Sequence, residues 1–113
     1  MVVSKEEDGY MGNFFPKGAT KLPEGSLKGV IKFMQESELF IGISSGLSWL
    51  AWGANVPVVL ISGFTEEKTE ASLDIVRIIN KTVCNGCWSN YDFDAGDWNW
   101  CPIYKNTSKQ FEC

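Results

Sequence analysis

The sequence has 113 residues, a net charge of −4 and no histidine, which is enough chain for one domain with a modest core but not for two. The negative charge disfavours a nucleic-acid binder and a polybasic membrane patch, and the absence of histidine excludes a Ser-His-Asp triad and histidine metal ligands within this chain. Because no stretch of about 18 apolar residues occurs and the first residues lack a signal-peptide pattern, we expect a cytoplasmic protein without membrane contact.

The first part of the chain is predicted to hold a short strand, a loop and a helix. Residues 1–5 favour a strand, and residues 14–25 are rich in proline and glycine, which is typical of a loop. Ser26 is a good N-cap, and the apolar residues after it repeat at helical spacing. We therefore predict an amphipathic helix that ends near Glu36 or Ser37.

Apolar runs that alternate with helical patterns follow. Strands are predicted at residues 40–43, 58–62 and 75–79. The first run suits a strand covered on both faces, a second helix is expected over residues 47–55, and an acidic stretch at residues 66–74 allows a short helix. This alternation predicts an α/β fold, a Rossmann-like parallel sheet with flanking helices.

Acidic side chains are concentrated in two runs, at residues 6–8 and 66–70. Charge runs of this kind are typical of a solvated surface, so we expect these carboxylates to lie in water. No residue of either run is assigned as a catalytic base.

Two loops at the ends of predicted strands are candidate ligand sites. Small polar residues and a glycine follow the first strand and open the second helix, an arrangement that binds diphosphates. The groups expected to hold a diphosphate there are the hydroxyls of Ser44 and Ser45 and the amides of Gly46 and Leu47. A second loop, made of Gly63, Phe64 and Thr65, follows the neighbouring strand at the same end of the sheet. The alternative is that Ser45 is only an N-cap and Gly46 only a turn residue.

Four cysteines near the end of the chain predict a metal site. Cys84 and Cys87 form a C-x2-C knuckle, and Gly86 between them lets backbone amides point at a thiolate. With Cys101 and Cys113 they supply four thiolates, which suit tetrahedral zinc or iron in a structural role and leave no open position for catalysis. Two disulfides, or a redox-active C-x2-C pair, are the alternatives.

Several segments carry a resemblance to known glycosyltransferases. Residues 40–51 resemble the strand, turn and helix of the nucleotide-sugar domain in ADP-heptose glycosyltransferases, except that Ser44 and Trp49 stand where that pattern has aspartate and histidine. A wider resemblance, from about Phe15 to Cys113, is to the bacterial autotransporter heptosyltransferases, whose own turn reads Ser-Ser-Gly-Leu-Ser-Trp. The segments that carry it are residues 45–52, 58–65, 83–88, 97–102 and 110–113.

This resemblance implies the C-terminal half of a GT-B glycosyltransferase, with a nucleotide-sugar-binding domain at residues 1–80 and a tetracysteine metal finger at residues 81–113. The nucleotide-sugar residues that it implies are Ser44, Ser45, Gly46, Leu47, Gly63, Phe64 and Thr65. The implied ligands of one structural metal ion are Cys84, Cys87, Cys101 and Cys113, and the resemblance favours iron over zinc.

The resemblance also implies partners. The full enzyme would transfer heptose from ADP-heptose to Ser or Thr hydroxyls of an autotransporter protein. Its acceptor site and catalytic base would lie in an N-terminal Rossmann-like half that this chain lacks. We therefore expect this chain to bind an ADP-sugar without catalysis, and to form homo-oligomers through the finger. The alternatives are a stand-alone, metal-stapled oligomerisation or interaction module and an electron-transfer iron protein.

Overall fold

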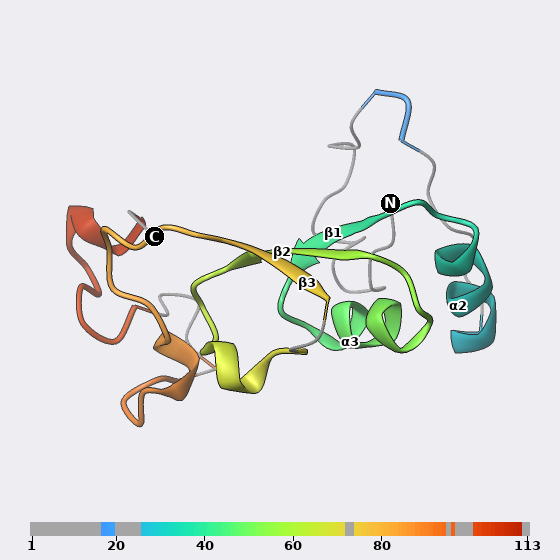
Figure 1. Cartoon of the computed structure of the whole chain (residues 1–113). Helices are drawn as coiled ribbons and strands as arrows, with labels where there is room; N and C mark the ends of the chain where they lie inside the picture. The colour runs from blue at the N-terminus through green and yellow to red at the C-terminus, as the bar shows by residue number, and fades with distance from the viewer. Residues whose placement is uncertain (1–16, 20–25, 72–73, 95, 97–100, 112–113) are drawn as a thin grey trace.

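The computed structural model of the chain describes residues 17–19, 26–71, 74–94, 96 and 101–111 (Figure 1). The strand predicted at residues 1–5 and most of the loop predicted at residues 14–25 lie outside these ranges. In the part of the chain that is described, no helix is long and apolar enough to span a bilayer.

A three-stranded parallel sheet forms the centre of the described residues (Figure 1). Its strands are β1 (Phe40–Ile43), β2 (Val58–Ser62) and β3 (Ile75–Ile79), in the spatial order β1-β2-β3. The first residues of the three strands are paired, Phe40 with Val58 and Val58 with Ile75. The parallel α/β sheet predicted from the sequence is confirmed, with its strands at the predicted residues.

Two helices accompany the sheet, α2 (Leu27–Gln35) and α3 (Gly46–Gly53). The Ser26 hydroxyl caps α2 by accepting a hydrogen bond of 3.4 Å from the Gly29 N–H, as the sequence predicted. The helix α3 ends before Asn55, whose positive φ of 66° closes the last turn. The short 3-10 elements are η1 (Glu67–Thr69), η2 (Cys87–Ser89) and η3 (Ser108–Phe111), and η1 stands where a short helix was predicted.

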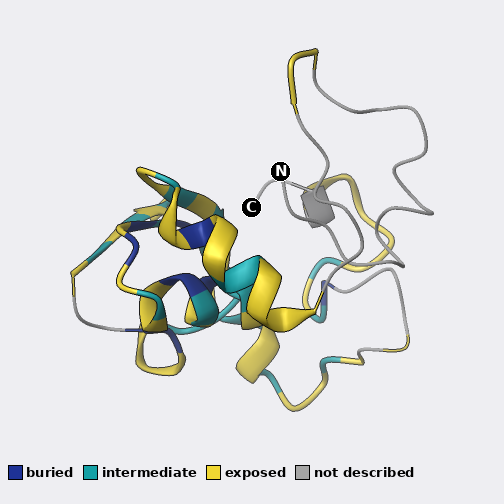
Figure 2. Cartoon of the chain, turned by 90° about the vertical axis from the view of Figure 1, so that its right-hand side faces the viewer, coloured by how far each residue is buried: buried dark blue, intermediate teal, exposed yellow. Residues whose placement is uncertain are grey.

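The core lies between the helices and one face of the sheet. Its buried residues are Met34 of α2, Ala51 of α3, Val56, and Val58 and Leu60 of β2. Figure 2 shows how few positions of the described chain are fully buried. Each such side chain of Val or Leu size contributes about 1.5–3 kcal/mol when it leaves water, so burial of this cluster stabilises the packing of the helices on the sheet.

The opposite face of the sheet is apolar and exposed. Its residues, each more than half exposed, are Ile41, Ile43, Ile61, Val76 and Ile78. The prediction that the first strand is covered on both faces is therefore wrong for the described residues. Side chains alternate along a strand, and the core that packs α2 and α3 uses only the face of Phe40, Val58 and Leu60.

Candidate functional site

The two predicted loops leave the sheet at one edge. Ser44 follows β1 and Gly63 follows β2, and these strands are parallel neighbours in which Ile43 pairs with Ile61. The carboxyl ends of β1 and β2 therefore lie side by side, which is where ligands bind in open parallel sheets. The placement of both loops at this edge, predicted from the sequence, is confirmed.

The turn into α3 is held by a capping box between Ser45 and Ser48. The buried Ser48 hydroxyl accepts a hydrogen bond from the Ser45 N–H (3.0 Å) and donates to the Ser45 carbonyl oxygen (2.7 Å). That carbonyl also accepts from the N–H groups of Ser48 and Trp49, at 3.1 and 3.3 Å. Ser45 occupies the N-cap position, and a capping box joins it to Ser48 at the third position of the helix.

These bonds leave the first two amides of α3 for another acceptor. The N–H groups of Gly46 and Leu47 stand at the positive end of the helix, where no intrahelical acceptor exists. Gly46 is exposed, and a Cβ built there would meet no described atom within 4 Å. The backbone at Gly46 is thus open to a ligand, which is the geometry that a diphosphate needs.

The loop of residues 63–65, called here the 63–65 loop, is attached to the cysteine knuckle (residues 84–87). The Gly86 N–H donates to the Gly63 carbonyl oxygen at 2.7 Å, and the Trp88 N–H donates to that of Phe64 at 3.0 Å. The prediction that Gly86 lets the knuckle amides point at a thiolate is therefore wrong for the Gly86 amide itself. The Gly86 N–H is already hydrogen-bonded to the Gly63 carbonyl oxygen, which comes close to it only in the folded chain.

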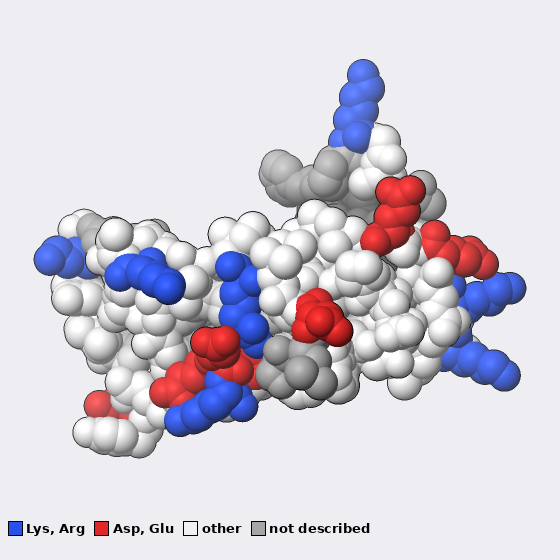
Figure 3. Space-filling model, in the orientation of Figure 1, with Lys and Arg blue, Asp and Glu red and all other residues white. Residues whose placement is uncertain are grey.

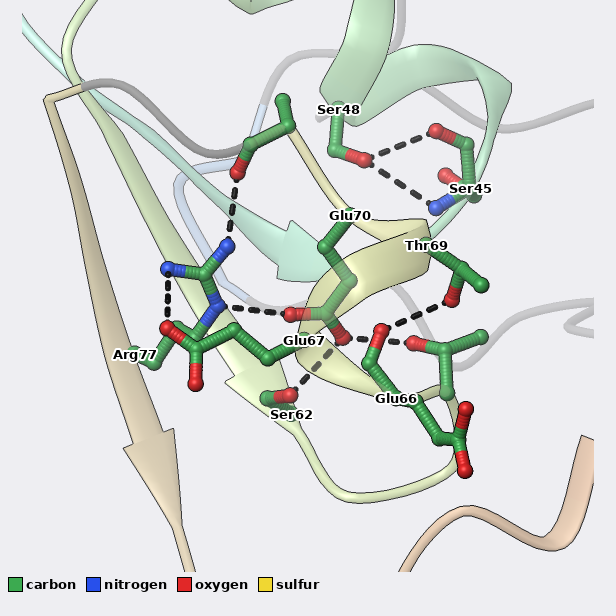
Figure 4. A network of polar contacts seen from close by, with 10 residues as sticks. Ser45, Ser48, Ser62, Glu66, Glu67, Thr69, Glu70 and Arg77 are labelled. Atoms are coloured by element: carbon green, nitrogen blue, oxygen red, sulfur yellow. Dashed lines mark hydrogen bonds and ion pairs between the residues drawn. The ribbon is translucent and has the colours of Figure 1, made fainter. Parts of the chain in front are cut away.

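Thr65, the last residue of the loop, belongs to a buried polar network (Figure 4). The Glu70 carboxylate, with 3 % of the residue exposed, accepts hydrogen bonds from Ser62 Oγ (2.8 Å) and Thr65 Oγ1 (2.5 Å) through Oε1. Its Oε2 accepts from Arg77 Nε at 2.8 Å, while Arg77 also donates to the Ala71 carbonyl oxygen at 2.7 Å.

The prediction that residues 66–70 form a solvated acidic run is wrong at Glu70 and holds at Glu67, whose side chain is 80% exposed. Figure 3 shows acidic and basic side chains side by side in this part of the surface. The sequence did contain a signal for a buried carboxylate. Arg77 stands within the apolar strand β3, and an arginine there needs a carboxylate partner.

This network decides what Thr65 can offer a ligand. Burial raises the pKa of Glu70, but hydrogen bonds from Thr65, Ser62 and Arg77 and the charge of Arg77 outweigh it, so the pKa lies below its ordinary value. The ionised Glu70 accepts the only proton of the Thr65 hydroxyl. Thr65 can therefore accept a hydrogen bond from a sugar hydroxyl or an amino group, but it cannot donate one to a phosphate.

A cavity of about 350 Å³ adjoins Thr65. Its lining residues are Thr65, Glu66, Glu67, Lys68, Ile79, Asn85 and Gly86. The structure thus brings the 63–65 loop together with the end of β3 and the knuckle, a neighbour that the sequence did not predict. No residue of the 44–47 turn lines this cavity.

Three of the four predicted metal ligands are described, and no disulfide joins any two of them. Cys84 and Cys87 are half-buried and Cys101 is buried, while Cys113 lies outside the described residues. Within the described ranges no three metal-binding side chains gather into one group. The donor chemistry fits a bound metal, because cysteine sulfurs are ligands of zinc and iron. The Tyr104 N–H donates to Cys101 Sγ at 3.0 Å. Gly86, with a positive φ of 80°, supplies the tight turn of the knuckle.

Comparison with known proteins gives relatives but no matching family model. The chain is 43% identical over 109 residues to the autotransporter heptosyltransferase Aah of Escherichia coli. This match covers 94% of this chain and 28% of that protein. It is 42% identical over 84 residues to the inactive autotransporter heptosyltransferase BimC of Burkholderia thailandensis, covering 73% of this chain and 20% of that protein.

Among solved structures the chain resembles the dodecameric iron-containing heptosyltransferase TibC of Escherichia coli in complex with ADP-D-beta-D-heptose. The TM-score is 0.75 at 41% identity, and the match covers 88% of this chain and 26% of that one. The resemblance to autotransporter heptosyltransferases is thereby confirmed. The chain is homologous to one part of these proteins and spans about a quarter of the length of the relatives that it matches.

Proposed function

We propose that this chain is the nucleotide-sugar-binding part of an autotransporter heptosyltransferase, corresponding to the C-terminal half of a GT-B fold. In this proposal residues 1–80 form the binding domain and residues 81–113 the metal finger. The observation that carries it is the pair of adjacent loops at the carboxyl ends of β1 and β2, in a chain similar to a heptosyltransferase solved with ADP-heptose.

The two loops would take different parts of the ligand. The diphosphate would lie over the amides of Gly46 and Leu47, with the hydroxyls of Ser44 and Ser45 as further donors. The 63–65 loop would face a part of the ligand that carries hydroxyl or amino protons, because Thr65 can only accept. Gly63 and Phe64 would contribute backbone surface there.

The cysteines would hold one structural metal ion. The proposed ligands are Cys84, Cys87, Cys101 and Cys113, with iron favoured because TibC is an iron-containing protein. A fully thiolate-coordinated ion would staple the tail of the chain rather than take part in transfer. A thiolate site also suits the reducing, cytoplasmic compartment expected from the sequence.

Heptose transfer from ADP-heptose to Ser or Thr of an autotransporter would then be an activity of a longer enzyme. We infer that this chain alone binds the nucleotide and does not catalyse the transfer. A relative of 42% identity is an inactive heptosyltransferase, so sequence similarity is no argument for activity.

Calorimetric titration of the full chain with ADP tests the proposal. We expect saturable binding, and no saturation at millimolar ADP would overturn it. Gly46→Ala should weaken binding about tenfold, or 1.4 kcal/mol, by placing a methyl group where the diphosphate approaches. Gly53→Ala is the matched control, because it lies in the same helix, its Cβ also meets open space, and it is distant from the turn. Equal ADP affinity in the two variants would contradict a site at Gly46.

A second candidate function is a metal-stapled interaction module that forms homo-oligomers through the finger. It is favoured by the exposed aromatic residues Trp88 and Tyr91 of that segment and by the dodecameric state of TibC. The variant Cys101→Ser distinguishes a docking role of the finger from a purely structural one. Sedimentation reports its assembly, and circular dichroism reports its fold. Loss of assembly in a folded protein supports docking, whereas loss of the fold supports a staple.

A further inference from the structure

The cysteine knuckle and the 63–65 loop are joined by contacts that bypass the rest of the sheet. Two backbone hydrogen bonds pair Gly86 with Gly63 and Trp88 with Phe64. In addition, the ring of Phe64 packs against that of Trp88, the residue that follows the knuckle. The centroid of the Trp88 ring lies 5.5 Å from that of Phe64 and 5.0 Å from that of Phe93, and Phe64 and Phe93 are 5.5 Å apart. These three rings form a small apolar cluster beside the loop.

The junction leaves no spare room on either side. A Cβ at Gly63 would lie 2.7 Å from Asn85 Oδ1, and a Cβ at Gly86 would lie 3.1 Å from Glu66 Cγ. The Asn85 amide is itself fixed by donating to the carbonyl oxygens of Asn80 and Val83, both at 3.0 Å. The end of β3, the knuckle and the loop are thus held in one arrangement, and a displaced knuckle must displace the loop.

We propose that residues 84–89 are a positioning element for the 63–65 loop, so that the conformation of the cysteine knuckle sets the affinity for ADP. The proposal rests on the proposed function for the ligand, but the coupling of knuckle and loop stands on the contacts alone. A change in the conformation of Cys84 or Cys87, such as one imposed by metal coordination, would then reach the 63–65 loop through Gly86 and Trp88.

Trp88 is the residue that tests this coupling. Trp88→Ala removes the indole ring that packs against Phe64 and keeps the backbone N–H of residue 88. Trp88→Phe keeps an aromatic ring and should restore the wild-type behaviour. Tyr91→Ala is the matched control, since Tyr91 is an aromatic residue of the same segment that is 96% exposed. Asn85→Ala is a second, independent variant that releases the knuckle from Asn80 and Val83.

Two measurements on the full chain are needed. Amide hydrogen exchange by NMR at Gly86 and Trp88 should be at least about tenfold faster in Trp88→Ala and in Asn85→Ala, while the amides of β2 stay protected because the sheet remains folded. The calorimetric affinity for ADP should fall about three- to tenfold in the same variants, and it should be unchanged in Tyr91→Ala.

The outcomes separate the two proposals. If wild-type protein binds no ADP, the proposed function fails, and the exchange rates alone decide the coupling. Unchanged exchange at Gly86 and Trp88 in both variants would overturn the coupling. Faster exchange with unchanged ADP affinity would overturn the positioning role, and so would a failure of Trp88→Phe to restore the affinity.

Discussion

At the scale of single residues, Glu70 shows how a buried charge can organise a loop. Its side chain is fully buried, and it is neutralised by the Arg77 guanidinium while Ser62 and Thr65 satisfy its other oxygen. The pair ties the end of β2 and the 63–65 loop to β3. The ion pair therefore fixes the position of a proposed ligand residue, Thr65, and at the same time its hydrogen-bonding direction.

Glu70→Gln should destabilise the protein by about 3 kcal/mol, because it leaves the Arg77 charge without its buried partner. Urea unfolding followed by circular dichroism measures the change. Glu67→Gln is the control, since Glu67 is 80% exposed and reaches Arg77 only at 3.6 Å, so it should cost less than about 0.5 kcal/mol. Equal losses in the two variants would show that burial of Glu70 has no energetic role.

The same carboxylate gives a pH dependence of stability. The folded-state pKa of Glu70 is held below its ordinary value of 4.5. A lowered carboxyl pKa stabilises the folded state above the ordinary value, and this stability is lost as the pH falls through the folded-state pKa. The urea midpoint of wild-type protein should therefore drop on acidification below about pH 4.5. Glu70→Gln should show a shallower drop, and parallel curves would refute the assignment.

At the scale of elements, the first turn of α3 depends on a reciprocal bond within the turn. Ser48 lies one turn into the helix and holds both backbone groups of Ser45. This capping serves the fold, while the amides of Gly46 and Leu47 have no acceptor within the helix. The turn is thus both a helix cap, as one hypothesis from the sequence had it, and an open site for an anion.

Ser48→Ala should cost about 1–2 kcal/mol, because the partly buried Ser45 N–H loses its acceptor. Thermal unfolding measures this loss of stability. Ser37→Ala is the control, since its hydroxyl makes an exposed bond of 3.0 Å to the Phe33 carbonyl oxygen at the end of α2. A smaller loss in Ser48→Ala than in Ser37→Ala would contradict the capping role.

At the scale of the whole molecule, the described residues cover only one face of the sheet. The open face presents isoleucines and a valine from all three strands, and contiguous apolar patches of this kind mark places where another surface packs. In parallel sheets both faces are normally covered by helices. The chain spans about a quarter of the length of the relatives that it matches.

The open face should make the isolated chain self-associate. Ile41→Thr with Ile78→Thr should lower the sedimentation coefficient measured at high protein concentration, because it removes apolar surface from the contact. Neither residue belongs to the core cluster, so the fold should be retained. Leu27→Thr, a change of an exposed apolar residue in α2, is the control. Association that persists unchanged in the double variant would exclude this face as the contact.

The sequence by itself determined the helices and strands, and it placed the two candidate loops at one edge of the sheet. The N-cap at Ser26, the helical spacing and the apolar runs are local signals, so α2, α3 and the three strands were predictable from them. Parallel connections then force both candidate loops to one edge of the sheet. The resemblance to autotransporter heptosyltransferases was carried by short motifs and was likewise visible without a structure.

Only the tertiary structure decided which groups meet. The partnership of Glu70 with Arg77 joins side chains seven residues apart, and the bonds from Gly86 and Trp88 join two loops more than twenty residues apart. Backbone donors and acceptors are the same at every residue except proline, so a bond between Gly86 and Gly63 leaves no side-chain pattern in the sequence. For the same reason the sequence showed a cysteine knuckle and a glycine loop separately, and their union became visible only when folding brought the two backbones into contact.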